Sequence, residues 1–482
     1  MAEPVRDSGR RLAILLSAFL LAACSTTRPT LNAPLQASAS AQAAAAVQPL
    51  VTMGHRGNPP AVIGAVALSG GGARAAAFGL GVLEELKATR VDLDGRPTTL
   101  LDEMGLVSGV SGGSVLASYY AAFGDEVFTR FEPDFLLPDF QSDLISYILA
   151  PGGLHRLTSP WYGRSNALAE RLDPVFRGLT FGDLKARGRG PRLLVTATDL
   201  TTGAPFEFTP EQFALICSDL DSVPLSFAVA ASSSVPVVLS PMTMRNYAGS
   251  CPQTIQDHEA PMPENNLSAR LLRMIATSYR NSQKRPYIHL VDGGVVDNLG
   301  VRGLLAHTIA SGSLRQSFAH LPPGSVHFIV LVSVNSERDI GDRLDDSDRV
   351  PSAAQVLDAL VFGAGSRTTT ETNAIVVDAA HRLADELMAD RGSDGSPFAA
   401  DAQLHVVNVS LRDIPDEALR QQLLHVPTAL TILPLQVRQL REAGRRALQA
   451  SPDFQQLLQA LQAREATVAS GEAAGGNAGN AH

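Results

Sequence analysis

The residues from Ile63 to Lys87 read IGAVALSGGGARAAAFGLGVLEELK. The run Ile63–Ser69 is short, apolar and partly β-branched, which is typical of a buried parallel strand. Three glycines, Gly70, Gly71 and Gly72, interrupt it, and from Ala75 to Lys87 large apolar side chains recur at helical spacing. The stretch therefore predicts a strand, a glycine turn and a helix, the repeating unit of an α/β protein.

The same alternation continues through the body of the chain and predicts an α/β fold with a mostly parallel sheet. The further strand candidates are Leu106–Val110, Leu193–Asp199, Tyr287–Val291, His327–Asn335 and His405–Leu411. The further helix candidates are Ser114–Phe123, Ser165–Val175, Leu299–Ser311, Ser352–Phe362, Thr370–Met388 and Leu435–Ala450.

Residues 61–450 are expected to form one domain. Residues 246–285 are polar and carry several prolines, so they are expected to form a surface insertion. Residues 465–482 are rich in Ala, Gly, Asn and Ser and lack large apolar side chains, which predicts a disordered tail.

Composition excludes several classes of protein. Of the 482 residues, 45% are hydrophobic and only 18% are charged, which argues against a coiled coil or a disordered chain. The net charge is −9 and no long Lys/Arg block occurs, so an electrostatic grip on nucleic acid is not expected. A globular protein, most simply an enzyme, remains.

The amino-terminal residues have the pattern of an export signal. Arg6, Arg10 and Arg11 precede the apolar run Leu12–Ala23, which is too short to cross a bilayer as a helix. The sequence Leu-Ala-Ala-Cys that ends at Cys24 resembles the lipobox of bacterial lipoproteins. The alternative is an ordinary secretory signal followed by a chance cysteine.

The lipobox resemblance implies that residues 1–23 are a signal peptide and that Cys24 receives acyl chains such as palmitate. The residue after the cysteine is Ser25 and not Asp, which in that class implies an outer-membrane lipoprotein. Residues 24–60, rich in Ser, Thr, Pro, Gln and Ala, are then expected to form a flexible tether.

Export also bears on the two remaining cysteines. In an oxidising compartment Cys217 and Cys251 are candidates for a disulfide. The alternative is a pair of buried free thiols. Two thiolates without a nearby pair of histidines do not predict a metal site.

Three glycine turns, each after a strand candidate, carry the chemistry. The turn at Gly109-Val110-Ser111-Gly112-Gly113 fits a nucleophilic serine, because a sharp strand-to-helix turn exposes the hydroxyl and glycines permit the close backbone approach. Gly70, Gly71 and Gly72 can offer backbone N–H groups to an oxyanion at a helix start, with Arg74 as a nearby cation. A nucleotide loop is the alternative, but the Gly-Lys-Ser/Thr ending is missing.

The third turn is Asp292-Gly293-Gly294, at the end of an apolar run. A carboxylate whose pKa is raised by burial can accept the proton of a serine hydroxyl if the two groups are within hydrogen-bonding reach. An aspartate that only forms a turn with two glycines is the plainer interpretation when the motif is considered alone.

Together these turns resemble the patatin-like phospholipases over most of residues 61–450. That family has the Gly-Gly-Gly-x-Arg loop, the Gly-x-Ser-x-Gly elbow and the Asp-Gly-Gly/Ala turn in this order. The block Ala230–Pro236 is also similar to its Ala/Ser-rich block. Ser69 departs from the Asp of better-known members, and Ala75 stands where Gly often follows the arginine.

The resemblance implies a patatin-like three-layer α/β/α catalytic domain. It also implies hydrolysis of carboxylic esters of lipids or phospholipids, of the phospholipase or lysophospholipase A type. Ser111 would be the nucleophile and Asp292 the base of a Ser-Asp dyad, with Gly70, Gly71 and Gly72 as the oxyanion loop. No metal and no cofactor is implied.

Two other functions stay open. A His-dependent α/β-hydrolase-type esterase or thioesterase would need one of the histidines that follow Asp292 as its base, and the candidates are His327, His381, His405 and His425. A non-catalytic lipid-binding envelope lipoprotein would keep the fold without turnover. The lone Trp161 and the apolar stretch Phe140–Leu149 are interpreted as core packing, with a membrane-facing lid or an acyl-chain wall as the alternative.

Overall fold

The computed structural model describes residues 25–36, 61–93, 95–188, 190–250, 266–338, 348–352, 355–356, 359 and 364–478. The predicted signal peptide, Cys24 and Cys251 lie outside these residues. In the described part of the chain, no helix combines the length and the apolar character needed to cross a bilayer.

The centre of the fold is a mostly parallel sheet, as the sequence predicts. Its neighbouring strands are, in order, β10 (Phe398–Ser410), β9 (Val326–Asn335), β1 (Val62–Leu68), β4 (Met104–Val110), β5 (Arg192–Asp199), β8 (Tyr287–Val291) and β7 (Met242–Arg245). The first five are parallel to one another, whereas β8, β7 and the short β6 (Pro205–Glu207) pair antiparallel. A separate hairpin is formed by β2 (Arg90–Leu93) and β3 (Arg96–Thr99).

Strand register brings the first two glycine turns together. Val66 pairs with Val107 of β4, and Leu68 pairs with Gly109. The two strands are parallel and end at the same edge, so the triple glycine after β1 and Ser111 after β4 leave the sheet side by side. This carboxyl edge is where open α/β sheets usually bind ligands.

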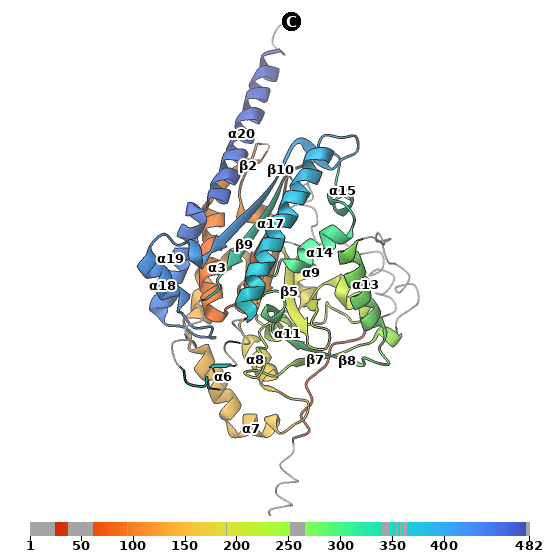
Figure 1. The fold of residues 1–482 in the computed structure, drawn as a ribbon, viewed down its shortest axis with the longest axis vertical. Coiled ribbons are helices and arrows are strands. Elements are labelled where there is room, and N and C mark those ends of the chain that lie inside the picture. Colours follow the sequence, from red (N-terminus) through yellow and green to blue (C-terminus); the bar gives the residue numbers. More distant parts are fainter. Residues whose placement is uncertain are drawn as a thin grey trace, which may run out of the picture.

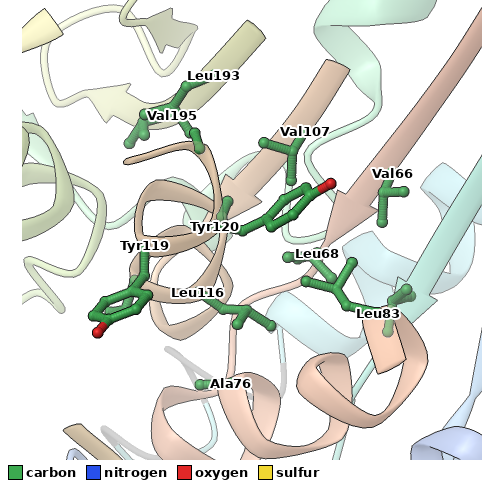
Figure 2. Packing of buried hydrophobic residues seen from close by; sticks show 14 of the residues in the cluster. Val66, Leu68, Ala76, Leu83, Val107, Leu116, Tyr119, Tyr120, Leu193 and Val195 are labelled. Atoms are coloured by element: carbon green, nitrogen blue, oxygen red, sulfur yellow. The ribbon is translucent and has the colours of Figure 1, made fainter. Parts of the chain in front are cut away.

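Helices cover both faces of the sheet, which confirms the predicted three-layer arrangement. Val66 and Leu68 of β1 belong to the larger core cluster, together with residues of α3 (Gly72–Ala88), α4 (Gly112–Phe123) and α19 (Pro434–Ala450). Figure 2 shows Leu83, Leu116 and Tyr120 packed on this face. On the other face, Ile63 and Ala67 contact residues of α14 (Arg302–Ala310) and α17 (Ala364–Asp390), and α17 crosses in front of β9 and β10 in Figure 1.

The remaining helices surround these layers. They are α5 (Val127–Phe131), α6 (Phe140–Leu149), α7 (Pro151–Leu157), α8 (Arg164–Leu172), α9 (Phe181–Arg187), α10 (Pro210–Leu215), α11 (Leu225–Ser232), α13 (Leu267–Arg280), α15 (Leu314–Ser317), α18 (Glu417–Leu424) and α20 (Pro452–Ala478). Single turns of tighter or wider helix occur at Leu101–Glu103, Gly124–Glu126, Glu132–Leu136, Ala248–Ser250, Gly293–Val295 and Leu411–Asp413.

Two segments differ from their predictions. The described part of the predicted surface insertion 246–285 includes α13, whose Tyr279 is fully buried and whose carbonyl accepts a hydrogen bond from Asn246. The predicted disordered tail 465–482 is helical up to Ala478 in α20. That helix is anchored by the buried Phe454 and Leu457, and its Ala, Gln and Glu residues favour continuation of the helix.

The described part of the predicted tether, residues 25–36, lies against the domain. Asn32 bonds to the side chain of Ser218 and to the backbone of Arg245, and Leu35 donates its N–H to the carbonyl of Cys217. Backbone hydrogen bonds of this kind fix a segment that its polar composition alone would leave flexible. Cys217 is disulfide-bonded, and its predicted pairing with Cys251 stays a prediction because Cys251 is outside the described residues.

Candidate active site

The turn that carries Ser111 is strained and tightly packed. β4 ends at Val110 and α4 begins at Gly112. Ser111 between them has φ 50° and ψ −123°, a backbone conformation that residues other than glycine rarely adopt. A Cβ on Gly109 would lie 2.6 Å from the carbonyl oxygen of Gly113, and a Cβ on Gly113 would lie 2.3 Å from that of Leu68. Only glycine fits at both positions, which explains the Gly-x-Ser-x-Gly spacing.

Hydrogen bonds hold this strained residue. The N–H of Ser111 donates to Ser232 Oγ at 2.8 Å, and the Ser232 hydroxyl donates to the carbonyl of Thr196 at 2.6 Å. The carbonyl of Ser111 accepts hydrogen bonds from both the N–H and the hydroxyl of Ser114. Every backbone polar group of Ser111 is therefore paired, while its side chain is left for chemistry.

Asp292, after β8, is the side chain that meets the Ser111 hydroxyl. Burial raises the pKa of Asp292 to about 6, opposed by the hydrogen bond from the N–H of Gly294 and by the nearby Ser111 hydroxyl. The Gly294 bond to Asp292 Oδ1 is 2.8 Å long. The Asp292 N–H donates to the carbonyl of Ser234, which fixes the backbone at the same point. The structure thus brings together the two residues that the sequence singles out as a dyad.

The triple-glycine loop lies against the serine turn. A Cβ on Gly112 would lie 2.1 Å from the carbonyl oxygen of Gly72, so the two backbones are in contact. The N–H of Gly70 donates to the carbonyl of Asn298 at 3.0 Å, and the N–H of Ala73 donates to that of Ala429 at 2.8 Å.

Of the predicted oxyanion loop, Gly70 therefore uses its N–H to hold the loop. Within the described residues, the amides of Gly71 and Gly72 are the ones that no hydrogen bond of the loop occupies. Gly71 has φ 139° and Gly72 has φ 62°. With these positive φ angles, their N–H groups do not point along the helix axis as those of helical residues do. Both stand at the start of α3, where the helix dipole favours an anion.

Residues 66–305 match the family model of the patatin-like phospholipases. The chain carries a patatin-like phospholipase domain. The match contains all three glycine turns, from Gly70 to Gly294.

Solved structures with a similar fold include human GIVD cytosolic phospholipase A2, at 13% identity and a TM-score of 0.43. This comparison covers 89% of the present chain and 65% of the human one. Its complexes with methyl gamma-linolenyl fluorophosphonate, without and with terbium chloride, are 14% and 13% identical with a TM-score of 0.38 for each, and cover 84% of this chain. They are covered over 59% and 60% of their length, so the chain spans less than two thirds of these proteins. No curated protein matches the sequence.

The arginine of the patatin-like loop is structural. Arg74 is buried, and it donates from Nε to the carbonyl of Ser336 at 2.8 Å and from Nη1 to that of Val426 at 2.6 Å. Burial and the nearby Arg338 lower its pKa to about 9, opposed by Glu337. Arg74 therefore ties the glycine loop to two segments far away in the sequence, and not to the turn's own carbonyls.

Ser69, which stands where better-known members of the family have Asp, bonds to the second hydroxyl-bearing residue Ser336. Ser69 Oγ accepts the N–H of Ser336 at 2.9 Å, and the Ser336 hydroxyl donates to the carbonyl of Gly70 at 3.0 Å. A pair of neutral hydroxyls thus holds the start of the patatin-like loop, which places no extra carboxylate beside Gly71 and Gly72.

Two residues after the aspartate turn have distinct positions. Asp297 accepts N–H bonds from Gly300 and Arg302, and burial raises its pKa to about 6. It caps α14, and that helix begins at Arg302 and not at the predicted Leu299. Asn298 donates to Thr369 and lies between the glycine loop and the turn that carries Asp292.

The Ala/Ser-rich block contributes more than sequence reasoning assigned to it. Ser232 binds the backbone of Ser111, and Ser234 binds that of Asp292. The family resemblance of the block was the available signal, but the partners of its two serines are far away in sequence and could not be read from it.

Three of the four histidines considered as alternative bases have other partners. His327 bonds to Asp401, His405 to Gln403 and His425 to the carbonyl of Gln421. Within the described residues, no histidine bonds to Ser111 or Asp292. The same part of the chain holds no cluster of His, Cys, Asp and Glu with the geometry of a metal site.

Proposed function

We propose that the protein is a serine acyl hydrolase that cleaves carboxylic ester bonds of lipids or phospholipids through a Ser-Asp dyad. The observation that carries this proposal is the position of the Ser111 hydroxyl beside the buried carboxylate of Asp292, whose pKa burial raises to about 6 and the Ser111 hydroxyl lowers. Such a carboxylate is ionised at neutral pH, yet is basic enough to accept a proton in the transition state.

In the proposed first half-reaction, Ser111 is acylated. Asp292 accepts the Ser111 proton as Ser111 Oγ attacks the acyl carbonyl carbon. The carbonyl oxygen becomes an anion that accepts hydrogen bonds from the N–H groups of Gly71 and Gly72. The tetrahedral intermediate then expels the alcohol, which takes the proton from Asp292, and leaves an acyl group on Ser111.

The second half-reaction repeats these roles with water. Asp292 removes a proton from a water molecule, whose oxygen attacks the acyl-enzyme carbonyl. The same two amides stabilise the second oxyanion. Collapse returns the proton to Ser111 and releases the fatty acid.

A fluorophosphonate probe and two esters test this proposal. The full chain, Ser111→Ala and Asp292→Asn are assayed with a short-chain nitrophenyl ester and with phospholipid, and the probe adduct is located by mass spectrometry. We expect turnover and a Ser111 adduct in the wild type only. Full activity in Asp292→Asn, together with loss in a variant of His381, would instead support the His-dependent esterase. No turnover and no adduct in any folded form would leave the lipid-binding function.

We also propose that residues 61–450 act as one catalytic domain and that acylated Cys24 anchors it to the outer membrane. The lipobox resemblance supports the anchor. Palmitate labelling of cells that produce the wild type and Cys24→Ser tests it, because label in the wild type alone is expected and equal labelling would refute it.

A further inference from the structure

An exposed apolar surface lies on and beside the hairpin of α6 and α7. Its side chains, which we call the hairpin face, are Leu137, Ile145, Leu149, Leu154 and Trp161. Leu149 is 59% exposed, Leu154 49% and Trp161 48%, far above what core packing would leave. The prediction that this stretch serves core packing therefore holds for one side of α6 only.

The other side of α6 is firmly packed. Phe140 and Leu144 are buried in the main core cluster, and Phe140 contacts Phe135 with ring centroids 5.4 Å apart. Asp139 caps the helix by accepting the N–H of Ser142. The hairpin face is thus presented by a fixed helix, and its exposure is built into the fold.

Two pairs of opposite charges lie beside the hairpin. Arg156 bonds to Glu170, and its guanidinium also lies over the ring of Tyr162 at 4.1 Å. Arg171 lies 3.5 Å from Asp143. Pairing lowers the cost of bringing this surface close to a medium of low dielectric constant.

The amino-terminal end of α6 is linked to the candidate active site through the segment Ala429–Thr431. Gln141 of α6 donates its N–H to Thr431 Oγ1 at 2.9 Å, and its side chain accepts the N–H of Leu430. The preceding Ala429 accepts the N–H of Ala73, in the first turn of α3. One short segment therefore joins the amino-terminal end of α6 to the helix start that follows the oxyanion loop.

The first described residues, from Ser25 to Arg28, lie on the same surface. The N–H of Ser25 donates to Thr158 Oγ1 at 2.8 Å, just after α7, and Ser159 donates to the carbonyl of Thr27 at 2.6 Å. The guanidinium of Arg28 lies 3.7 Å from the centre of the Trp161 ring. The first described residue, Ser25, is therefore bound at the hairpin, and it directly follows the proposed acylation site Cys24 in the sequence.

We infer that the hairpin face docks onto a lipid bilayer and holds the active-site edge of the sheet toward the membrane. The inference rests on the proposed function, since it takes the lipid substrate and the Cys24 anchor from there. Tryptophan and arginine suit the headgroup level of a bilayer, and the leucines and Ile145 suit the region just beneath it. A lipid could then reach Ser111 directly from the membrane. In Figure 1, α6 and α7 lie at the end of the molecule opposite the carboxyl-terminal end of α20.

The chain supplies its own reporter, because Trp161 is its only tryptophan. The full chain is reconstituted on phosphatidylcholine vesicles that contain some phosphatidylglycerol, with and without bromine on the acyl chains. We expect the Trp161 emission to shift to the blue, brominated lipid to quench it, and aqueous iodide to lose access to it. Ser111→Ala should give the same result, so that failure of the catalytic proposal is distinguished from failure of this one.

A Trp161 that iodide quenches and brominated lipid does not, in protein that sediments with the vesicles, would overturn the docking surface. Failure of the chain to bind vesicles at all would do the same. Trp161→Phe confirms that the signal comes from this residue.

A pair of variants tests the consequence for turnover. Leu149→Ser combined with Leu154→Ser should lower the ratio of vesicle hydrolysis to soluble nitrophenyl ester hydrolysis by about tenfold or more, because two apolar side chains no longer enter the lipid. Met388→Ser is the matched control. Met388 is 63% exposed. It is next to Leu387, which belongs to the same core cluster as Phe398, at the amino-terminal end of strand β10 and so away from the active-site edge of the sheet. An unchanged ratio in the double variant would contradict the inference.

Discussion

Replacing the carboxylate of Asp292, the proposed catalytic base, should make the protein more stable while abolishing turnover. Burial raises the pKa of Asp292 from 3.8 to about 6. The folded protein therefore binds this proton more tightly than the unfolded chain, and the ionised form destabilises the fold. The difference of about two pH units, at about 1.4 kcal/mol each, lowers the free energy of unfolding by ~3 kcal/mol above pH 6.

Asp292→Asn removes this cost and keeps the shape. The amide oxygen can still accept the N–H of Gly294, and the new NH₂ group can donate to the Ser111 oxygen. We expect the variant to exceed the wild type in free energy of unfolding by ~3 kcal/mol at pH 8. The gain should shrink as the pH falls through 6 and vanish below about pH 4, where both folded and unfolded wild type are protonated.

Urea unfolding of both proteins at pH 8 and at pH 4, followed by circular dichroism, measures this gain. Asp348→Asn, at an exposed carboxylate, is the control and should change little at either pH. A variant that is no more stable than the wild type at pH 8, or a gain of the same size at pH 4, would refute the argument that Asp292 is held at a cost. Residual ester hydrolysis by Asp292→Asn at wild-type level would separately refute its role as base.

Three further predictions concern the same site. First, kcat/KM for a soluble ester should rise tenfold per pH unit below about pH 6 and level off above it, because only ionised Asp292 accepts the proton; a flat profile from pH 5 to 8 would contradict this. Second, Ser232→Ala should lower kcat on the order of a hundredfold with a folded protein, because it frees the strained Ser111 backbone, and fluorophosphonate labelling rates would measure the loss. Third, Arg74→Lys should lower the free energy of unfolding by about 3 kcal/mol, since one ammonium cannot span the carbonyls of Ser336 and Val426, and an unchanged urea midpoint would disprove it.

The parts of the fold that the sequence predicts have strong local signals. Apolar runs that end in glycines mark β1 and β4, and each strand lies within two residues of its predicted bounds. The meeting of Ser111 and Asp292 was also within reach, because both follow strand candidates and one family pattern contains both. For Ser111 and the glycine loop a local pattern suffices, since the parallel strands β1 and β4 end at one edge of the sheet. Asp292 follows β8, which pairs antiparallel with the carboxyl-terminal end of β5, so its place beside Ser111 is predicted by the family pattern alone.

Other features depend on contacts between distant residues. Gly70 was grouped with Gly71 and Gly72 because the three look alike in sequence, yet only its amide faces the carbonyl of Asn298. The docking of residues 25–36 rests on Asn32 and on backbone hydrogen bonds, which polar composition does not reveal. Position in the fold, and not residue type, decides these roles.

The candidate active site contains two destabilising features, and one segment of the chain holds both in place. Ser111 has a backbone conformation that costs about 1–3 kcal/mol, and the buried charge of Asp292 adds to it. Ser232 and Ser234, two residues apart, bind the backbones of these two residues. Because α11, which ends at Ser232, is almost wholly buried, neither can relax without disturbing the core. The segment thus uses the packing of α11 to align the Ser111 hydroxyl with Asp292, so variants in this segment should lose activity before they lose the fold.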